Sequence, residues 1–298
     1  GAMLYADRSG VRRSIDDGTT FAATQGLPAD LWIGHLAVNP FVAGQVIAGT
    51  RYGQGGATLY RSVDSGATWS PLFAPALSGE ALSVVFVNAS TYAVSVGGRI
   101  YYTSDNGANW TQIHDLTGAR LVRLPQSNEL LATNGVSCVR TSTLFATTQD
   151  CSAGLPAPVD GEYPTTSLSV VDDGNGADRV LATVRGSGVV ALETGASAWV
   201  ASNRQLHAYA IRGLALSPRD PAWIVAGRSL PDGVDGPLLA TRDAGATWQR
   251  ALGGAANYIY TIEFDPTTGP GALATRLYAA GTTVRHVGIP MTSGIYRS

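Results

Sequence analysis

A repeated eight-residue motif constrains the fold of this 298-residue chain more than any other feature of its sequence. Four segments align without gaps to the pattern Ser/Thr-x-Asp-x-Gly-x-Thr-Trp/Phe, with one Asn in place of the second Thr: Ser14–Phe21, Ser62–Trp69, Thr103–Trp110 and Thr241–Trp248. A short alternating strand is expected before each copy. Four such copies indicate a repeat architecture, in which each unit buries its apolar face against its neighbours.

The residue types of the motif are those of a tight hairpin turn. An Asp side chain in this position accepts backbone N–H bonds across the turn, and the Gly two residues later supplies a positive φ. The Ser or Thr hydroxyl adds a local hydrogen bond, and the Trp or Phe packs its ring between neighbouring elements. We therefore predict structural roles for the four motif aspartates, Asp16, Asp64, Asp105 and Asp243.

The same order of elements recurs around each motif: an apolar strand, a turn, a second apolar strand, the strand that enters the motif and the strand that leaves it. One unit is expected at Leu31–Asn39, Gln45–Thr50, Thr58–Val63 and Thr68–Phe73, and the next at Ala81–Val87, Tyr92–Val96, Ile100–Ser104 and Asn109–Ile113. Later units are expected to begin at Leu121, Leu168, Ile211 and Ile259. Four strands in about 45 residues correspond to one blade of an all-β propeller with four-stranded antiparallel blades.

The spacing of the units predicts the number of blades and the domain organisation. Five units are complete and a partial unit stands at each end, since Gly294–Ser298 resembles Leu59–Ser62. We favour seven blades, two of them incomplete, over six blades with overlapping ends, and a third alternative is a fragment of a longer propeller. Residues 1–3 resemble the remnant of a cleaved tag, which leaves residues 4–298 as a single predicted propeller domain.

Composition limits the classes of partner. The formal charge is −2 and charged residues make up 14 % of the chain, so the sequence gives no electrostatic reason to expect nucleic acid. The sequence has no apolar run of about 20 residues, so no membrane insertion is predicted. No cofactor is predicted either. All 20 basic residues are Arg, which we interpret as the codon bias of a bacterial source.

The only two cysteines, Cys138 and Cys151, flank a unit that lacks the motif. A disulfide between them would close a short loop in an oxidising compartment and stabilise the fold by about 3 kcal/mol. Two buried thiols are the alternative. We favour the disulfide and an extracytoplasmic location, either periplasmic, at the cell surface or secreted.

The motif resembles the Asp-box, or bacterial neuraminidase repeat, of sialidases, sortilin-type receptors, xyloglucanases and photosystem II assembly factors. The resemblance covers essentially the whole chain. It implies a propeller, but not one function, because these relatives share the fold and differ in activity.

The enzymes of this group provide one alternative, a glycoside hydrolase. Arg123-Leu124-Pro125 resembles a sialidase motif but stands in the fourth unit, and Tyr258, Tyr260 and Glu263 resemble a Tyr/Glu pair but also fit an ordinary strand. A xyloglucanase would need two facing carboxylates, for which Glu80, Glu263 and Asp232 or Asp235 are the loose candidates. The four His show no metal-ligand spacing, so no catalytic or metal site is assigned.

Ligands of a propeller are expected at the face opposite the motif turns, where loops of several blades converge. Arg8, Arg51, Arg185 and Arg228 follow the second strand of four units, where they form a guanidinium ring for an acidic group or keep the surface soluble. Arg99, Arg120 and Arg123 are also expected at this face. The predicted ligand-binding set is Trp32, His35, Arg51, Tyr52, Arg185, Tyr209, Arg212, Arg228 and Tyr258.

These features favour a non-catalytic binding or assembly module over an enzyme. Its ligand would be a protein or a glycan, and the domain is expected to be monomeric. A structural spacer within a multidomain protein is the third hypothesis.

Overall fold

The computed structural model describes residues 1–7, 9–51, 58–72, 79–142, 146–157, 165–172, 177–203, 211–217, 220, 222–228, 238–252, 258–264, 277–283 and 292–297. All regular secondary structure in these ranges is β-strand. Accordingly, they hold no helix long and apolar enough to cross a membrane.

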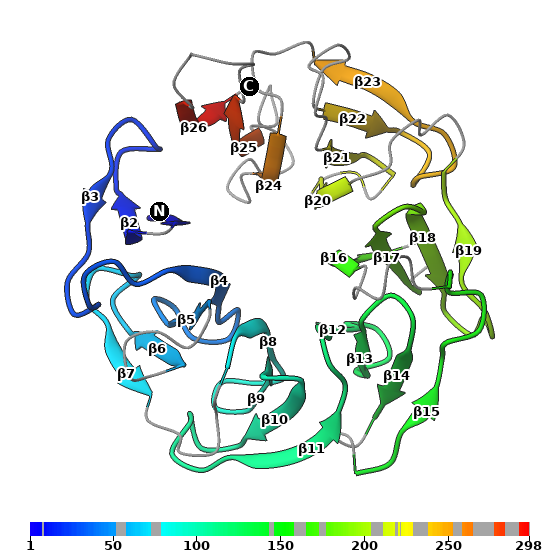
Figure 1. Cartoon of the computed structure of the whole chain (residues 1–298), viewed down its shortest axis with the longest axis horizontal. Coiled ribbons are helices and arrows are strands. Elements are labelled where there is room, and N and C mark those ends of the chain that lie inside the picture. Colours follow the sequence, from blue (N-terminus) through cyan, green and yellow to red (C-terminus); the bar gives the residue numbers. More distant parts are fainter. Residues whose placement is uncertain are drawn as a thin grey trace. The chain divides into compact units, whose positions relative to one another are not determined.

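The strands of the described ranges form antiparallel sheets in chain order (Figure 1). The three-stranded sheet at the N-terminus has β1 (Met3–Asp7), β2 (Gly10–Ser14) and β3 (Ala22–Ala23). Two four-stranded sheets follow: β4 (Ile33–Val38), β5 (Val46–Thr50), β6 (Leu59–Ser62) and β7 (Ser70–Leu72), then β8 (Ala81–Phe86), β9 (Tyr92–Val96), β10 (Arg99–Thr103) and β11 (Thr111–Asp115).

Three more four-stranded sheets and a three-stranded sheet complete the order. They are β12 (Arg120–Arg123), β13 (Leu130–Thr133), β14 (Cys138–Thr141) and β15 (Gln149–Asp150); β16 (Thr165–Asp172), β17 (Asp178–Val184), β18 (Gly188–Glu193) and β19 (Val200–Ala201); β20 (Ile211–Leu216), β21 (Ile224–Arg228), β22 (Leu238–Thr241) and β23 (Gln249–Leu252); and β24 (Tyr258–Phe264), β25 (Leu277–Thr283) and β26 (Thr292–Arg297).

The prediction of seven blades, favoured over six, is wrong. Among the described residues only five sheets have four strands, and the strands at the two chain ends form the three-stranded sheets β1–β2–β3 and β24–β25–β26. Motif spacing counts turns, and a turn forms whether or not its sheet has all four strands. The strands of the two units predicted in detail are confirmed to within three residues at each end.

The chain divides into two compact units, and the boundary runs through the sheet β12–β15. Unit 1 comprises residues 1–123, 129–134 and 140–149, and unit 2 comprises residues 124–128, 135–139 and 150–298. In unit 1 the first strands β4, β8 and β12 lie side by side, and in unit 2 β16, β20 and β24 do so. Whether residues 4–298 form a single domain stays a prediction.

The core lies between the faces of neighbouring sheets. Ile47 and Leu59 from one sheet pack with Val94 and Tyr101 from the next in unit 1, and Leu181 in unit 2 belongs to a similar cluster with residues of β20–β22. Second strands are buried along their whole length in β5, β9 and β13. β5 and β9 each pack against a neighbouring sheet of unit 1, as in the contacts β5–β8 and β9–β12. This explains their continuous apolar sequences.

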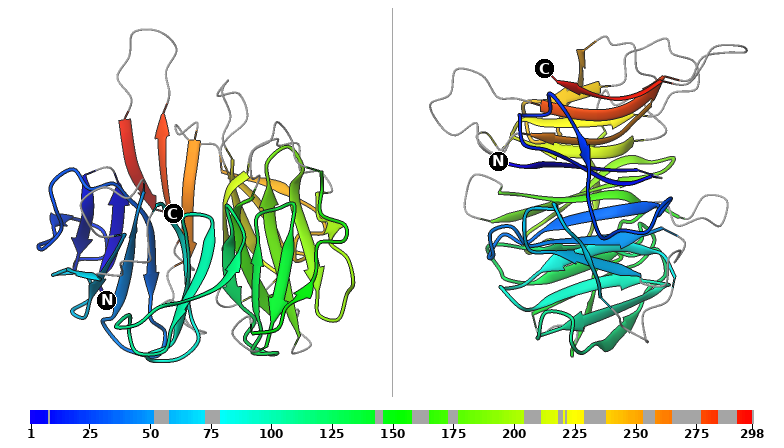
Figure 2. Two further views of the ribbon diagram at one scale, coloured as in Figure 1. Left: turned by 60° about the horizontal axis from the view of Figure 1, so that its bottom comes forward. Right: turned by 90° about the vertical axis from the view of Figure 1, so that its left-hand side faces the viewer.

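Each sheet has two unlike ends (Figure 2). Because its strands are antiparallel, successive connections between them lie at alternate ends of the sheet. In the four-stranded sheets that carry the motif, its turn joins the third and fourth strands and hydrogen-bonds to the loop between the first and second strands: Ser65 N–H to Gly44 O (2.8 Å), Asn106 N–H to Ser90 O (3.0 Å) and Ala244 N–H to Ala222 O (3.0 Å). In the N-terminal sheet the motif turn joins β2 and β3. We call this end of each sheet the turn end. The opposite end carries the loops between second and third strands and the connections to the next sheet.

Candidate functional site

The turn end is held together by hydrogen bonds within each motif. In the turn after β6, Ser62 Oγ donates to Asp64 Oδ1 (2.7 Å) and accepts from Gly66 N–H (2.8 Å). Asp64 Oδ1 accepts from Thr68 N–H (2.9 Å), and Asp64 Oδ2 accepts from the Thr68 hydroxyl (2.6 Å). Trp69 is buried and donates its indole N–H to Gly66 O (3.2 Å). Every acceptor group of this Asp is therefore engaged inside its own turn.

The other three motifs repeat this pattern. Thr20, Asn109 and Thr247 donate to Asp16, Asp105 and Asp243 through both the backbone and the side chain. Hydrogen bonds lower the pKa of Asp16, Asp64 and Asp105 to about 2. In Asp243, burial raises the pKa but the hydrogen bonds outweigh it, so the net shift is downward. The predicted structural role fits this geometry, and all four carboxylates are exposed.

Arginines from neighbouring sheets fasten three of the turns. Arg13 Nε donates to Ser65 O (2.9 Å), Arg61 Nη1 donates to Asn106 O (2.9 Å), and Arg179 Nη1 donates to Ala244 O. In each case the acceptor is the carbonyl of the residue between Asp and Gly, which has a positive φ in all four motifs: Asp17, Ser65, Asn106 and Ala244. These guanidinium groups join one sheet to the next and do not face a ligand.

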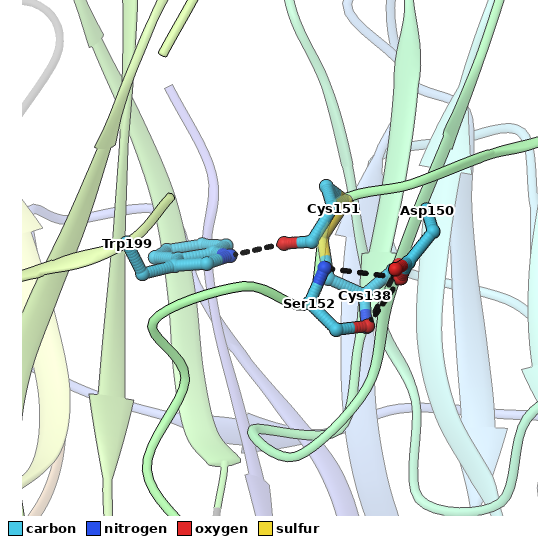
Figure 3. The surroundings of a disulfide bond; sticks show 5 residues. All are labelled: Cys138, Asp150, Cys151, Ser152 and Trp199. Carbon is cyan, nitrogen blue, oxygen red and sulfur yellow. Dashed lines mark hydrogen bonds between the residues drawn. A yellow bond between two sulfur atoms is a disulfide. The ribbon is translucent and has the colours of Figure 1, made fainter. Parts of the chain in front are cut away.

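The disulfide between Cys138 and Cys151 is present, as predicted (Figure 3). It joins the first residue of β14 to the residue after β15, at the opposite end of a sheet whose third and fourth strands lack the motif. Ser152 Oγ accepts from Cys138 N–H (2.9 Å), and the Trp199 indole N–H donates to Cys151 O (2.9 Å). Cys138 is fully buried and Cys151 nearly so, which makes the bond a structural tie between strands.

At the opposite end in unit 1, Arg51 is held by two side chains. Its guanidinium carbon lies 4.6 Å from the centre of the Trp32 ring, and its Nε lies 3.1 Å from Glu80 Oε1. Its backbone N–H donates to Trp32 O (2.8 Å). The Arg51 and Glu80 side chains remain 41 % and 31 % exposed, although Arg51 Nε itself is buried beneath them.

His35 belongs to the same neighbourhood and links two first strands. Its Nε2 accepts from Val84 N–H (3.2 Å), which bridges β4 and β8. Burial, together with the positive charge of Arg120, lowers the pKa of His35 to about 4. His35 is thus neutral near pH 7, with Nε2 engaged by the backbone, and it positions the strand beside Arg51 without adding charge.

Arg120 brings a second guanidinium group to this cluster through a β-bulge. The first strands β4, β8, β16, β20 and β24 each shift register near their start, for example between Ala81 and Ser83. In β8 the bulged residue is Leu82, and its carbonyl accepts a hydrogen bond from Arg120 Nη1. Burial lowers the pKa of Arg120, and the charges of Glu80 and Arg51 act on it in opposite directions. Bulges re-aim backbone groups in this way and are frequent beside functional sites.

We call Trp32, His35, Arg51, Glu80 and Arg120 the Arg51 cluster. Two guanidinium groups, one carboxylate and a neutral imidazole leave it with one net positive charge. A flat aromatic ring under a guanidinium group, with a further cation beside it, has the chemistry to bind a carboxylate.

The structure brings together only part of the predicted ligand-binding set. Trp32, His35 and Arg51 meet in the Arg51 cluster. Arg185 and Arg212 are exposed in unit 2. The side chains of Arg228 and Tyr258 lie outside the described residues, as do Arg8, Tyr52 and Tyr209 entirely. The guanidinium ring as a whole is therefore untested.

Two further arginines behave differently from the expectation of a shared ligand face. Arg99 lies at the opposite end as predicted but pairs with Asp115 (Nε to Oδ1, 3.5 Å). Arg123 ends β12 at the turn end, where its guanidinium carbon lies 5.7 Å from the centre of the Phe41 ring, so its predicted place on the opposite face is wrong. Glu80 and Arg120 complete the cluster, and neither belongs to the predicted ligand-binding set.

The carboxylates considered for catalysis do not form a described pair. Glu80 pairs with Arg51. Glu263 reaches solvent from β24, although the surrounding protein raises the pKa of its carboxyl group. Asp232 and Asp235 lie outside the described residues. Within the described part of the chain, no three His, Cys, Asp or Glu side chains are grouped to hold a metal ion.

Antiparallel four-stranded sheets with side-by-side first strands define a class, the β-propellers. The chain belongs to the family of the DUF6242 β-propeller domain, whose sequence profile matches residues 41–255. No match to a curated protein sequence was found. The narrower assignment to the Asp-box repeat family is not confirmed by these comparisons.

Solved structures share the fold at low sequence identity. YCF48 bound to a D1 peptide is 18 % identical with a TM-score of 0.59, covering 86 % of this chain and 80 % of that chain. The GH74 xyloglucanase from Xanthomonas campestris is 15 % identical with a TM-score of 0.50, covering all of this chain and 63 % of that one. The extracellular domain of the putative hybrid two-component system BT4673 from B. thetaiotaomicron is 12 % identical with a TM-score of 0.59. The match covers 94 % of this chain and 35 % of that chain.

Proposed function

We propose that this β-propeller is a non-catalytic binding module that recognises an acidic segment of a partner protein at the Arg51 cluster. Arg51 carries the proposal, because its guanidinium group is oriented by Trp32 and its side chain is 41 % exposed. A pre-oriented guanidinium group loses little freedom on binding a carboxylate, so more of the interaction energy appears as affinity.

The surroundings of Arg51 support a recognition role over a purely solvating one. Arg120 adds a second positive charge, and the bulge at Leu82 and the His35–Val84 bond fix the strands on which these side chains stand. The cluster also offers no second carboxylate that could work with Glu80 as an acid–base pair.

The partner class and location rest on indirect support. The similar YCF48 structure contains a bound D1 peptide, and the disulfide suits an oxidising, extracytoplasmic compartment. An extracellular domain is also among the similar structures. We infer a monomeric module outside the cytoplasm, with a protein segment favoured over a glycan.

The proposal is tested by titrating the protein with an N-acetylated, C-amidated hexaglutamate peptide at low ionic strength. Arg51→Ala should weaken binding about tenfold or more, because a charge-assisted hydrogen bond is lost. Arg242→Ala is the matched control, since Arg242 also stacks on a Trp and pairs with an Asp, but at the turn end. It removes the same charge and should leave the affinity unchanged.

Equal affinities for the wild type and Arg51→Ala would contradict the proposal. Binding of an acidic oligosaccharide without binding of the peptide would instead assign the site to glycans. Turnover in a broad glycoside screen, abolished by replacing one carboxylate, would make the protein a hydrolase.

A further inference from the structure

We propose that Glu80 is an internal mimic of the ligand: its carboxylate occupies the place on Arg51 that an incoming carboxylate takes, and ligand binding displaces it. The inference rests on the proposed function of the Arg51 cluster and names its mechanism of recognition. It follows from how Arg51 and Glu80 are each held.

The orientation of Arg51 does not depend on Glu80. The Trp32 ring supports one face of the guanidinium group, the Arg51 backbone bonds to Trp32 O, and Gly34 leaves room for the Arg51 stem. A Cβ at Gly34 would lie 3.4 Å from Arg51 Cβ, a tight contact. Removing the Glu80 carboxylate thus leaves a pre-oriented cation.

The backbone of Glu80, in contrast, is fixed, while its side chain has somewhere to go. Gly79 has a φ of 107°, and a Cβ there would lie 2.8 Å from Gly97 Cα, so only Gly fits this approach. Gly97 N–H donates to Glu80 O (3.1 Å). These contacts deliver the Glu80 side chain to Arg51, yet its 31 % exposure lets it rotate into water when another carboxylate arrives.

Charge explains why displacement is favoured over simple addition. With Glu80 in place, the cluster holds one net positive charge, and a second carboxylate on Arg51 would meet the first. An exposed ion pair contributes little free energy, so a ligand replaces Glu80 at small cost and gains an equivalent bond. The ligand group that fits is accordingly a planar carboxylate, as in Asp or Glu side chains.

The test compares the hexaglutamate affinity of Glu80→Gln with that of the wild type. Glu80→Gln should bind the peptide about two- to fivefold more tightly, because the competing charge is removed while the side-chain volume is kept. Asp115→Asn is the control: it removes the same charge from the Arg99 pair at the opposite end of the same unit. Its gain should be clearly smaller. A hexaglutamine peptide should distinguish none of these proteins.

An unchanged or weaker affinity of Glu80→Gln would overturn the inference, and so would an equal gain for Asp115→Asn, since that would reflect net charge alone. The proposed function fails separately, when Arg51→Ala binds the hexaglutamate peptide as tightly as the wild type. Absence of binding by both the wild type and Glu80→Gln contradicts both proposals.

Discussion

Among the described residues, an arginine, a tryptophan and a carboxylate come together at both kinds of sheet end. Arg51 stacks on Trp32 and pairs with Glu80 at the opposite end in unit 1. Arg242 stacks on Trp223 (3.8 Å to the ring centre) and lies 3.8 Å from Asp220 at the turn end in unit 2. Their difference lies in what surrounds them.

The turn-end combination is tied into local structure. Asp220 also accepts from Ala222 N–H (3.0 Å), and Trp223 packs edge-on against Phe264 at 5.0 Å. In the Arg51 cluster, the Glu80 carboxylate pairs with Arg51 and acts on Arg120 through its charge, and Arg120 donates to the carbonyl of the bulged residue Leu82. Similar residue types thus differ in their neighbours: Asp220 and Trp223 also make local contacts, whereas the Arg51 cluster contains a second guanidinium group and keeps one net positive charge.

The disulfide sharpens this comparison, because it lies at an opposite end but has no charge to offer. Replacing both Cys138 and Cys151 by Ala should lower the free energy of unfolding by about 3 kcal/mol, since the reduced chain regains the freedom of a loop with a sequence separation of 13. Denaturant unfolding of the oxidised wild type and the double variant measures this difference.

Reduced wild-type protein is the control and should unfold with the double variant. Hexaglutamate binding by the folded variant should be unchanged. Equal stability of all three proteins would mean that the disulfide contributes nothing to stability. A loss of hexaglutamate affinity in the folded double variant would contradict the assignment of binding to the Arg51 cluster.

The turn end can be divided further into buried and exposed hydrogen bonds. Thr103→Val keeps the shape of a buried side chain but leaves Gly107 N–H, which is also buried, without the Thr103 hydroxyl. This should cost about 1–3 kcal/mol of stability. Asp105→Ala should cost less, because Asp105 and its donor Asn109 are exposed and water replaces the lost bonds.

Thermal or denaturant unfolding of both variants decides the order. Hexaglutamate affinity should stay constant in each. The account of the turns is wrong if Asp105→Ala is the more destabilised of the two, or if either variant loses affinity while it remains folded.

The smallest expected effect concerns one residue of the fourth turn. Ala244 has a φ of 54°, where the other turns have Asp17, Ser65 and Asn106. Asn tolerates this left-handed conformation better than Ala, so Ala244→Asn should stabilise the protein by about 0.5 kcal/mol. Ala246→Asn, in the same turn without a positive φ, should give no gain. A melting comparison in which both variants behave alike would contradict the assignment of strain to Ala244.

The sequence predicted the turns well because their chemistry is local. Asp64, Ser62 and Thr68 lie within seven residues, so one motif specifies the whole hydrogen-bond set. The disulfide was predictable for a similar reason, as Cys138 had one possible partner within the chain.

The Arg51 cluster could be predicted only in part, because its contacts join separate strands. Arg51 and Trp32 were chosen from their position in the repeat, but nothing in the spacing pairs Arg51 with Glu80 or places Arg120 on Leu82 O. A bulge adds one residue to a strand and shifts its inward and outward alternation, but the repeat spacing does not show which strands carry one. β12 lacks the register shift of the other first strands. The predicted position of Arg123 was wrong because Arg120 and Arg123 lie at the two ends of β12 (Arg120–Arg123), so they face opposite ends of the sheet.

The central claim is that the ligand binds at the Arg51 cluster and not at the motif turns. Hydrogen–deuterium exchange with and without the hexaglutamate peptide tests it most directly, since it reports both ends in one experiment. The account predicts slower exchange on binding at residues 31–35, 49–51 and 79–83, and none in the motif turns at residues 64–69 and 105–110. Protection of those turns, with no change around Arg51, would contradict the account.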